Sequence, residues 1–154
     1  FCDEAYRELG RDLRFVQVNL STTLDRGAVR GMHFQRPPAA EAKLIRCVRG
    51  EVFDVAVDLR IDSPTFLHWH ATVLRADEPR EVFIPEGFAH GFQALADDVQ
   101  LLYFHTARWT PGCEGGVRHD DPRLAIDWPL APVMVSERDR SHPLIARNFT
   151  GLSA

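Results

Sequence analysis

The sequence predicts an all-β domain in which short strands form a sandwich or a barrel. Eight segments rich in Val, Phe, Leu and Ile lie between residues 15 and 105. Turn-forming clusters separate these segments, as at Asp25-Arg-Gly27, Arg36-Pro-Pro38 and Pro85-Glu-Gly87. Helical spacing of apolar residues, by contrast, is nearly confined to the start of the chain.

The first expected element is a short helix over residues 1–9. Its apolar residues Phe1, Ala5, Tyr6 and Leu9 lie on one helical face, and Gly10 is a natural stop. The strands expected after it span residues 15–20, 28–34, 43–48, 51–59, 67–74, 81–84, 88–95 and 99–105.

The segment from Val52 to Leu59 shows the clearest alternation. Its odd-numbered residues are apolar and share one face, whereas Asp54 and Asp58 share the other. Past Thr110 the strand pattern ends, and we expect loops followed by a short helical turn at residues 136–139. Because no repeat, linker or composition shift is apparent, one domain is expected to span residues 1–154.

Composition and charge argue against several classes of function. The formal net charge is −4, which argues against nucleic acid as a partner. No apolar run approaches the roughly 18 residues of a membrane span and no signal sequence opens the chain, so a cytoplasmic location is expected. Cys2, Cys47 and Cys113 form no C-x-x-C pair and are expected to be free thiols.

Two histidines lie beside glycines within expected strands. His33 follows Gly31, and His90 precedes Gly91, where small neighbours leave room beside an imidazole. From the spacing alone, each histidine either lines a pocket or is a hydrogen-bonded residue of the core.

Two scarce residue types supply further candidates. Lys43 is the only lysine among 18 basic side chains, so its position either requires a compact ammonium group or holds a stray surface residue. Tyr103 shares a strand face with Leu101 and His105, and its phenol is either a core group or a catalytic acid.

Two spacings also have both a structural and a functional interpretation. Ser136 and Asp139 have the S-x-x-D spacing of a helix cap, but the carboxylate would also be able to orient an imidazole. His68-Trp-His70 places two imidazoles on one side of a strand, which would begin a metal site only if a third ligand lay within reach.

Six motifs spread over most of the chain are long enough to be specific. They are Val29-Arg-Gly-Met-His-Phe-Gln35, the stretch 42–60, Ser63-Pro-Thr-Phe66, Ile84-Pro-Glu-Gly-Phe-Ala-His-Gly-Phe92, Asp120-Asp-Pro122 and Ile126-Asp-Trp-Pro129. From near Phe1 to near Pro143, the chain closely resembles the dTDP-4-dehydrorhamnose 3,5-epimerase family. The resemblance implies a cupin-type jelly-roll barrel, usually a homodimer, that needs no metal or other cofactor and acts on a dTDP-linked 4-keto-6-deoxy sugar.

The resemblance also implies a role for individual residues. His33 is similar to the family's general base, Asp139 to the carboxylate that orients it, Lys43 to the lysine near the ketone, and Tyr103 to the acid on the opposite face. Other residues expected in the substrate site are Arg30, Gln17, Asn19, Arg46 and His90. An ideal strand would send Arg30 and His33 to opposite faces, so we expect a β-bulge at Gly31.

The chemistry of such a reaction explains these residue types. Removing a proton from the carbon beside a ketone places negative charge on the ketone oxygen, which an ammonium group stabilises. Inversion needs a base on one face of the ring and a proton donor on the other. A carboxylate beside the imidazole fixes its tautomer and raises its basicity.

The sequence departs from the family pattern in three ways. Trp109 stands where many members have a second tyrosine and would be able to stack on thymine. His70 and His119 replace apolar or Trp residues, which would mark an altered sugar preference. The family's N-terminal strand segment, which reaches the neighbouring subunit and contacts the nucleotide, would lie before Phe1 and is expected to be lacking.

The leading hypothesis is therefore an epimerase that inverts C3, C5 or both carbons of a dTDP-4-keto-6-deoxyhexose. One alternative is a metal-dependent cupin enzyme that uses His33, His90 and either His68 or His70. A second alternative is a noncatalytic barrel that binds a sugar nucleotide.

Overall fold

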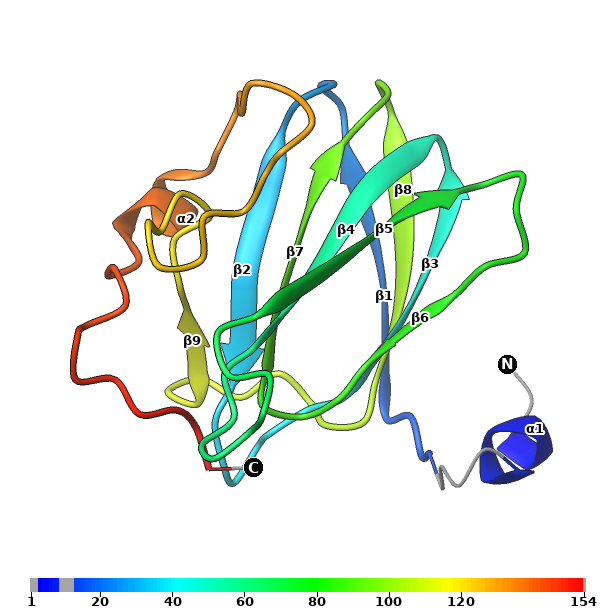
Figure 1. The fold of residues 1–154 in the computed structure, drawn as a ribbon. Helices are drawn as coiled ribbons and strands as arrows, with labels where there is room; N and C mark the ends of the chain where they lie inside the picture. The colour runs from blue at the N-terminus through cyan, green and yellow to red at the C-terminus, as the bar shows by residue number, and fades with distance from the viewer. Residues whose placement is uncertain (1–2, 9–12, 154) are drawn as a thin grey trace.

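The computed structural model describes residues 3–8 and 13–153, which form two antiparallel β-sheets and two short helices (Figure 1). The four-stranded sheet has the order β1-β8-β3-β6, and the five-stranded sheet has the order β5-β4-β7-β2-β9. The elements are α1 (Asp3–Glu8), β1 (Gln17–Thr23), β2 (Val29–Gln35), β3 (Lys43–Arg49), β4 (Glu51–Asp58), β5 (Trp69–Arg75), β6 (Val82–Ile84), β7 (Phe88–Ala94), β8 (Val99–His105), β9 (Glu114–Gly116) and α2 (Glu137–Ser141). The all-β prediction is confirmed.

All eight predicted strands are present, with their ends shifted by a few residues. The largest shifts are in β1 and β5: both begin two residues later than expected, at Gln17 and Trp69, and β1 ends three residues later, at Thr23. The prediction missed β9, because Glu114-Gly-Gly116 carries no β-branched or aromatic residue. This strand forms because it pairs with β2, where Phe34 lies opposite Gly115.

Both helices fall where the sequence predicted helical structure. Residues 1–2 and 9–10 of the expected first helix and its stop lie outside the described residues, and α1 covers the middle of that segment. The second helix runs past the expected turn to Ser141. The hydroxyl of Ser136 accepts a hydrogen bond from the amide of Asp139 at 3.0 Å, which confirms the predicted cap.

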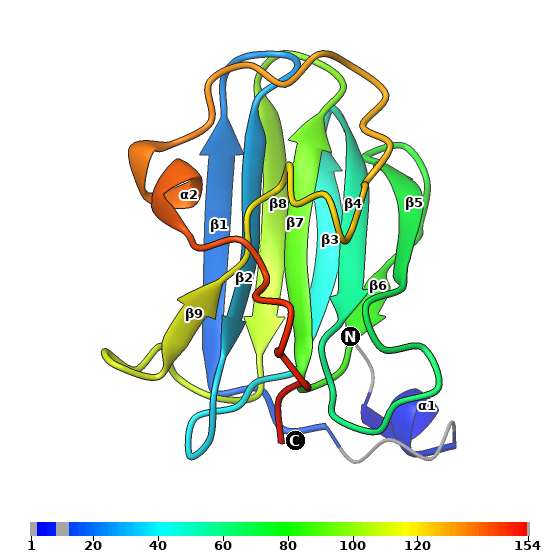
Figure 2. The same ribbon diagram turned by 60° about the vertical axis from the view of Figure 1, so that its left-hand side comes forward.

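Two apolar cores stabilise the sheets. One lies between them and contains Ile45, Leu74, Phe92 and Leu101 among others. The other lies on the outer face of the five-stranded sheet, where the chain after β9 crosses β2 and β7 (Figure 2) and adds residues such as Ile126 and Ile145. The five-stranded sheet is therefore covered on both faces.

Because both faces of this sheet are covered, the polar face that the alternation predicted for β4 is buried. Asp54 and Asp58 are each only 1% exposed, although their face was expected to be the polar one. Buried carboxylates require partners, and each has one: Asp54 lies 2.8 Å from His90, and Asp58 accepts hydrogen bonds from Arg60. β4 is a central strand, and apolar cores cover both faces of its sheet, which explains why these two carboxylates are buried.

Two expectations from composition can be compared with the described residues. Cys47 and Cys113 are free thiols, as expected, whereas Cys2 lies outside the described residues. Among the helices of the described chain, none has the length and apolar character required to cross a membrane.

Candidate active site

A cavity of about 370 Å³ lies between the two sheets and receives side chains from both. Six of the residues expected in the site line it: Asn19, Arg30, His33, Lys43, His90 and Tyr103. His33 belongs to β2 of the five-stranded sheet, and Tyr103 belongs to β8 of the four-stranded sheet. The imidazole and the phenol therefore enter the cavity from opposite walls.

The expected bulge in β2 is present and explains how Arg30 and His33 reach the same cavity. The pairing of β2 with β7 shifts register between these two residues. Gly31 has a φ of +116°, and a Cβ there would lie 2.5 Å from the Cα of Gly91. Only glycine fits at position 31, because the paired strands β2 and β7 approach each other too closely there for a side chain.

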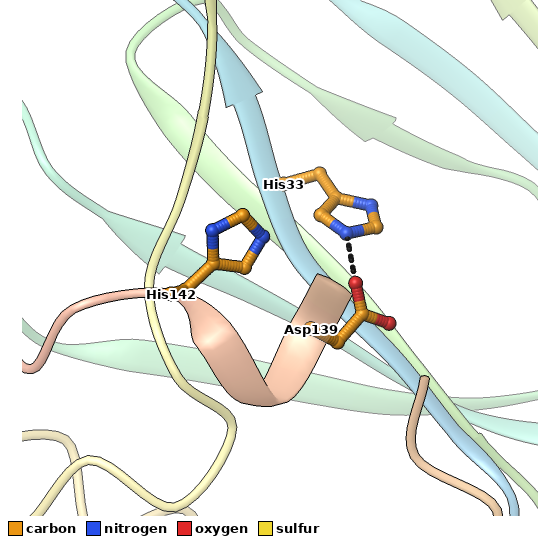
Figure 3. A group of neighbouring side chains, drawn as sticks. All are labelled: His33, Asp139 and His142. Carbon is orange, nitrogen blue, oxygen red and sulfur yellow. Dashed lines mark hydrogen bonds and ion pairs between the residues drawn. The ribbon is translucent and has the colours of Figure 1, made fainter. Parts of the chain in front are cut away.

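The bulge also frees a backbone amide that holds the carboxylate of Asp139. The N–H of Gly31 donates to Oδ2 of Asp139 at 3.2 Å, while Nε2 of His33 lies 2.7 Å from Oδ1 (Figure 3). Burial alone would raise the pKa of Asp139, but the hydrogen bonds from His33, Gly31 and Ser136 and the charge of His33 together lower it. The carboxylate is thus ionised and accepts a hydrogen bond from Nε2–H of His33; in the neutral form of such an imidazole, the lone pair lies on Nδ1.

A third side chain, His142, packs beside this pair without joining it (Figure 3). Its ring centre is 5.7 Å from that of His33, and its Nε2 is buried with no hydrogen-bond partner among the described residues. Burial and the neighbouring charge of His33 lower the pKa of His142. A neutral imidazole therefore stands beside the His33–Asp139 pair.

The same three residues are the only group of potential metal ligands that lie close together in the described chain. Their ligand atoms fall within 4.8 Å of one another. Both oxygens of Asp139 already accept hydrogen bonds, from His33 and from Gly31. The geometry is that of a carboxylate that orients an imidazole, so the fit to a metal is weak.

Lys43 projects into the cavity from β3 and is nearly buried. Its Nζ lies 3.2 Å from Oε1 of Glu41 and 3.4 Å from the carbonyl oxygen of His33. The interpretation of Lys43 as a stray surface residue is therefore wrong. Sequence reasoning missed Glu41, although residues two apart in an extended segment share a face, and that spacing would have indicated the pair.

Tyr103 carries a hydroxyl that makes no hydrogen bond to any residue in the described part of the chain. Burial and the charge of Asp54 raise its pKa well above 10.0, so the phenol remains protonated at neutral pH. Its ring meets that of His90 edge-on at 5.8 Å, and Nε2 of His90 lies 2.8 Å from Asp54. A second carboxylate–imidazole pair thus supports the phenol.

Besides Asp139, which lies behind His33, three expected residues do not line this cavity. Arg46 lies on the face of β3 opposite Lys43 and Ile45, because side chains alternate along a strand. It pairs there with Glu81 at 3.7 Å. Trp109 is half exposed and lines an adjoining hollow that shares His33 and Lys43 with the cavity. Gln17 bridges the two regions, because its side chain contacts Asn19 and the amide of Trp109 at 3.0 Å each.

The metal-dependent alternative fails on geometry. His68 precedes β5 rather than lying in it, and His68 and His70 line a separate hollow with Asp58. They do not join His33 and His90, which line the main cavity. His119 is buried away from the cavity, so neither His70 nor His119 lines it.

Comparison with known proteins shows the family of the chain. The profile of the dTDP-4-dehydrorhamnose 3,5-epimerase family matches residues 1–147. The chain belongs to this family. The dTDP-4-dehydrorhamnose 3-epimerase of Streptomyces niveus is 45% identical over 144 residues, which cover 94% of this chain and 69% of the relative. The dTDP-4-dehydrorhamnose 3,5-epimerase of Methanothermobacter thermautotrophicus is 45% identical over 151 residues, which cover 96% of this chain and 80% of the relative.

A solved member of the dTDP-4-dehydrorhamnose 3,5-epimerase family confirms the fold. The dTDP-6-deoxy-D-glucose-3,5-epimerase of Legionella pneumophila, solved in complex with dTDP-4-keto-L-rhamnose, superposes with a TM-score of 0.90 at 39% identity. The match covers 100% of this chain and 84% of that structure. The cupin-like jelly-roll prediction is therefore confirmed, and this chain is a member of an isomerase family.

Proposed function

We propose that this protein is an epimerase that inverts C3, C5 or both carbons of a dTDP-4-keto-6-deoxyhexose. The observation that carries the proposal is the placement of His33 and Tyr103 on opposite walls of one cavity that also receives Lys43. An imidazole on one face of a sugar ring and a phenol on the other provide the two partners that inversion requires.

Each group has a task in the proposed reaction. Nδ1 of His33 removes a proton from the carbon beside the C4 ketone, and the electrons of that C–H bond form an enolate. The ammonium of Lys43 stabilises the negative charge on the enolate oxygen more strongly than it binds the neutral ketone. The hydroxyl of Tyr103 then donates its proton to the opposite face of the same carbon, which inverts the centre.

Asp139 assists by controlling His33. Its carboxylate fixes the tautomer in which Nδ1 is the base, and it stabilises the imidazolium that forms when the proton arrives. Arg30, Asn19 and His90 line the same cavity and contribute polar contacts to the sugar nucleotide. Trp109 offers an exposed indole in the adjoining hollow, which fits a stacked thymine base.

The relatives divide between one and two inverted carbons. One is a 3-epimerase and another a 3,5-epimerase, and each is 45% identical to this chain. The number of carbons inverted here is therefore a question for experiment. Incubation of the protein with dTDP-4-keto-6-deoxyglucose in D₂O, followed by NMR, counts the carbons that acquire deuterium.

The same measurement tests the assignment of the base. His33→Ala should lose deuterium incorporation, because Nδ1 of His33 is the base that removes the proton in the proposed step. Incorporation at the wild-type rate in this variant would remove His33 from the role. Tight binding of the sugar nucleotide by the wild-type chain without any exchange would instead favour the noncatalytic barrel.

We also propose that the protein is a homodimer. The outer face of β1, which is an edge strand, exposes 56% of Val18 and 60% of Leu20. Val18 lies opposite Phe104 and Leu20 opposite Leu102, so apolar side chains continue across the sheet. An apolar stripe at a sheet edge is a typical site of association, and the molar mass in solution tests the proposal.

A further inference from the structure

A buried carboxylate, Glu41, lies behind the amine of Lys43 and also contacts a second group of the cavity wall. Oε1 of Glu41 is 3.2 Å from Nζ of Lys43, and Oε2 is 2.8 Å from Nδ1 of His105. The side chains of Glu41, Lys43 and His105 are 9%, 9% and 11% exposed. Both carboxylate oxygens are therefore occupied, each by a different side chain.

The strand pairing imposes this arrangement. Lys43 of β3 lies directly opposite His105 of β8, so their side chains stand next to each other on the inner face of the sheet. The segment before Lys43 is fixed as well, because the amide of Ala42 donates to the hydroxyl of Thr106 at 2.8 Å and the amide of Thr106 donates to the carbonyl of Ala42 at 3.1 Å. Glu41 consequently has little freedom to leave the pair.

The charges of the cluster are balanced. Burial alone would raise the pKa of Glu41, but the hydrogen bond from His105 and the positive charge of Lys43 lower it. An ionised carboxylate thus lies against a buried ammonium, whose burial without a counter-ion would cost several kcal/mol. The long lysine stem is flexible, so contacts with Glu41 and with the carbonyl of His33 are needed to fix the position of the amine.

His105 connects the cluster to the phenol. Its ring stacks on that of Tyr103, with centres 5.9 Å apart and planes inclined by 16°. With Nδ1 directed to Glu41, the remaining ring nitrogen, Nε2, is buried and makes no hydrogen bond within the described chain. The contacts of His105 are therefore the hydrogen bond to Glu41 and the stacking on Tyr103.

We propose that Glu41, held in place by His105, is a positioning residue that fixes the amine of Lys43 at the cavity wall. The proposal rests on the epimerase function, because it assigns to Glu41 an effect on the step in which the enolate forms. Glu41 acts through Lys43 and has no proton to transfer to the sugar.

The first test is Glu41→Gln, which keeps the size and one acceptor oxygen of the side chain but removes its charge. We expect kcat to fall about 10- to 100-fold with KM changed less than about threefold, because Lys43 is needed most when the enolate oxygen carries charge. Glu51→Gln is the matched control, since it removes a carboxylate from the ion pair with Arg75, away from the cavity. This control should keep wild-type kcat and KM.

A second test observes the side-chain ammonium of Lys43 directly by NMR. Because Lys43 is the only lysine, protein labelled with [¹⁵N]lysine has a single side-chain ammonium to observe by NMR. The wild-type chain and Glu51→Gln should show a sharp, slowly exchanging signal, and Glu41→Gln should broaden or lose it. If Glu41→Gln fails to fold, His105→Phe serves as the second variant, because it keeps the ring beside Tyr103 and removes the hydrogen bond to Glu41; kcat should fall about three- to tenfold.

The outcomes separate the two proposals. An unchanged ammonium signal in Glu41→Gln, or a changed signal with wild-type kcat, would overturn the positioning role. A wild-type chain that shows no exchange at the sugar would count against the epimerase function, while the ammonium spectra would still decide whether Glu41 fixes Lys43.

Discussion

His33 and Asp139 are separated by 106 positions in the chain, yet Nε2 of the imidazole lies 2.7 Å from Oδ1 of the carboxylate. Two local features bring them together: the bulge at Gly31 turns His33 toward the cavity, and the cap at Ser136 begins the helix that carries Asp139. The carboxylate is 2% exposed and has hydrogen-bond donors on both oxygens. It is therefore fixed before any substrate arrives.

The first prediction concerns the charge of Asp139. Asp139→Asn should lower kcat about 10²- to 10⁴-fold, because an amide neither fixes the correct tautomer nor stabilises the imidazolium. Steady-state turnover and deuterium incorporation measure the effect. Asp120→Asn, which removes an exposed carboxylate paired with Arg118, is the control and should retain activity. Equal rates for the two variants would contradict the role of Asp139.

The second prediction concerns pH and stability. The folded state lowers the pKa of Asp139 below the ordinary 3.8, so ionised Asp139 stabilises the fold above that pH, and the contribution disappears as pH falls through the folded-state value. The difference in unfolding free energy between the wild type and Asp139→Asn should therefore be constant near neutrality and shrink in acid. Urea denaturation between pH 7 and pH 3 measures it, and a difference that grew in acid would reverse the sign of the argument.

The third prediction separates proton removal from proton return. Tyr103→Phe deletes a hydroxyl that has no partner in the described chain, so the folded state should keep its stability. Inversion should slow by about 10²-fold or more, while His33 continues to exchange the sugar proton with solvent. NMR in D₂O distinguishes exchange with retention from exchange with inversion. Inversion at the wild-type rate would exclude the phenol as the donor.

The fourth prediction concerns the close approach of the paired strands β2 and β7 at Gly31. Gly31→Ala should destabilise the fold by about 3 kcal/mol, because a Cβ would lie 2.5 Å from Gly91 at a φ of +116°. Gly112→Ala is the matched control: its φ is +85°, but no atom lies within 4 Å of the added Cβ. It should cost only about 1 kcal/mol. If chemical denaturation gave similar losses of unfolding free energy for the two variants, the strands would not be tightly packed at Gly31.

The fifth prediction addresses the metal-dependent alternative. Activity should survive dialysis against a chelator, because the proposed steps use side chains alone and both oxygens of Asp139 are engaged in hydrogen bonds. Elemental analysis of the purified protein accompanies the assay. Stoichiometric metal together with loss of activity after chelation would favour a metal bound at His33, Asp139 and His142.

The local sequence pattern predicted most of the strands. Alternation and turn residues located eight strands, and Gly31 between Arg30 and His33 indicated a bulge that the pairing with β7 confirms. β9 was missed because a strand of Glu-Gly-Gly has no local preference and exists only through its pairing with β2. Arg46 was expected in the cavity, but strand alternation sends it to the face opposite Lys43.

The sequence by itself determined the residue types: one lysine, a histidine beside a glycine, a scarce tyrosine and a capped aspartate, in an order that resembles a known family. Only the tertiary structure decided which of them meet. The contacts of Asp139 with His33 and of Glu41 with His105 join segments 106 and 64 positions apart. Such contacts depend on sheet order and register, which arise from the packing of the whole chain and leave no periodic trace in a single sequence.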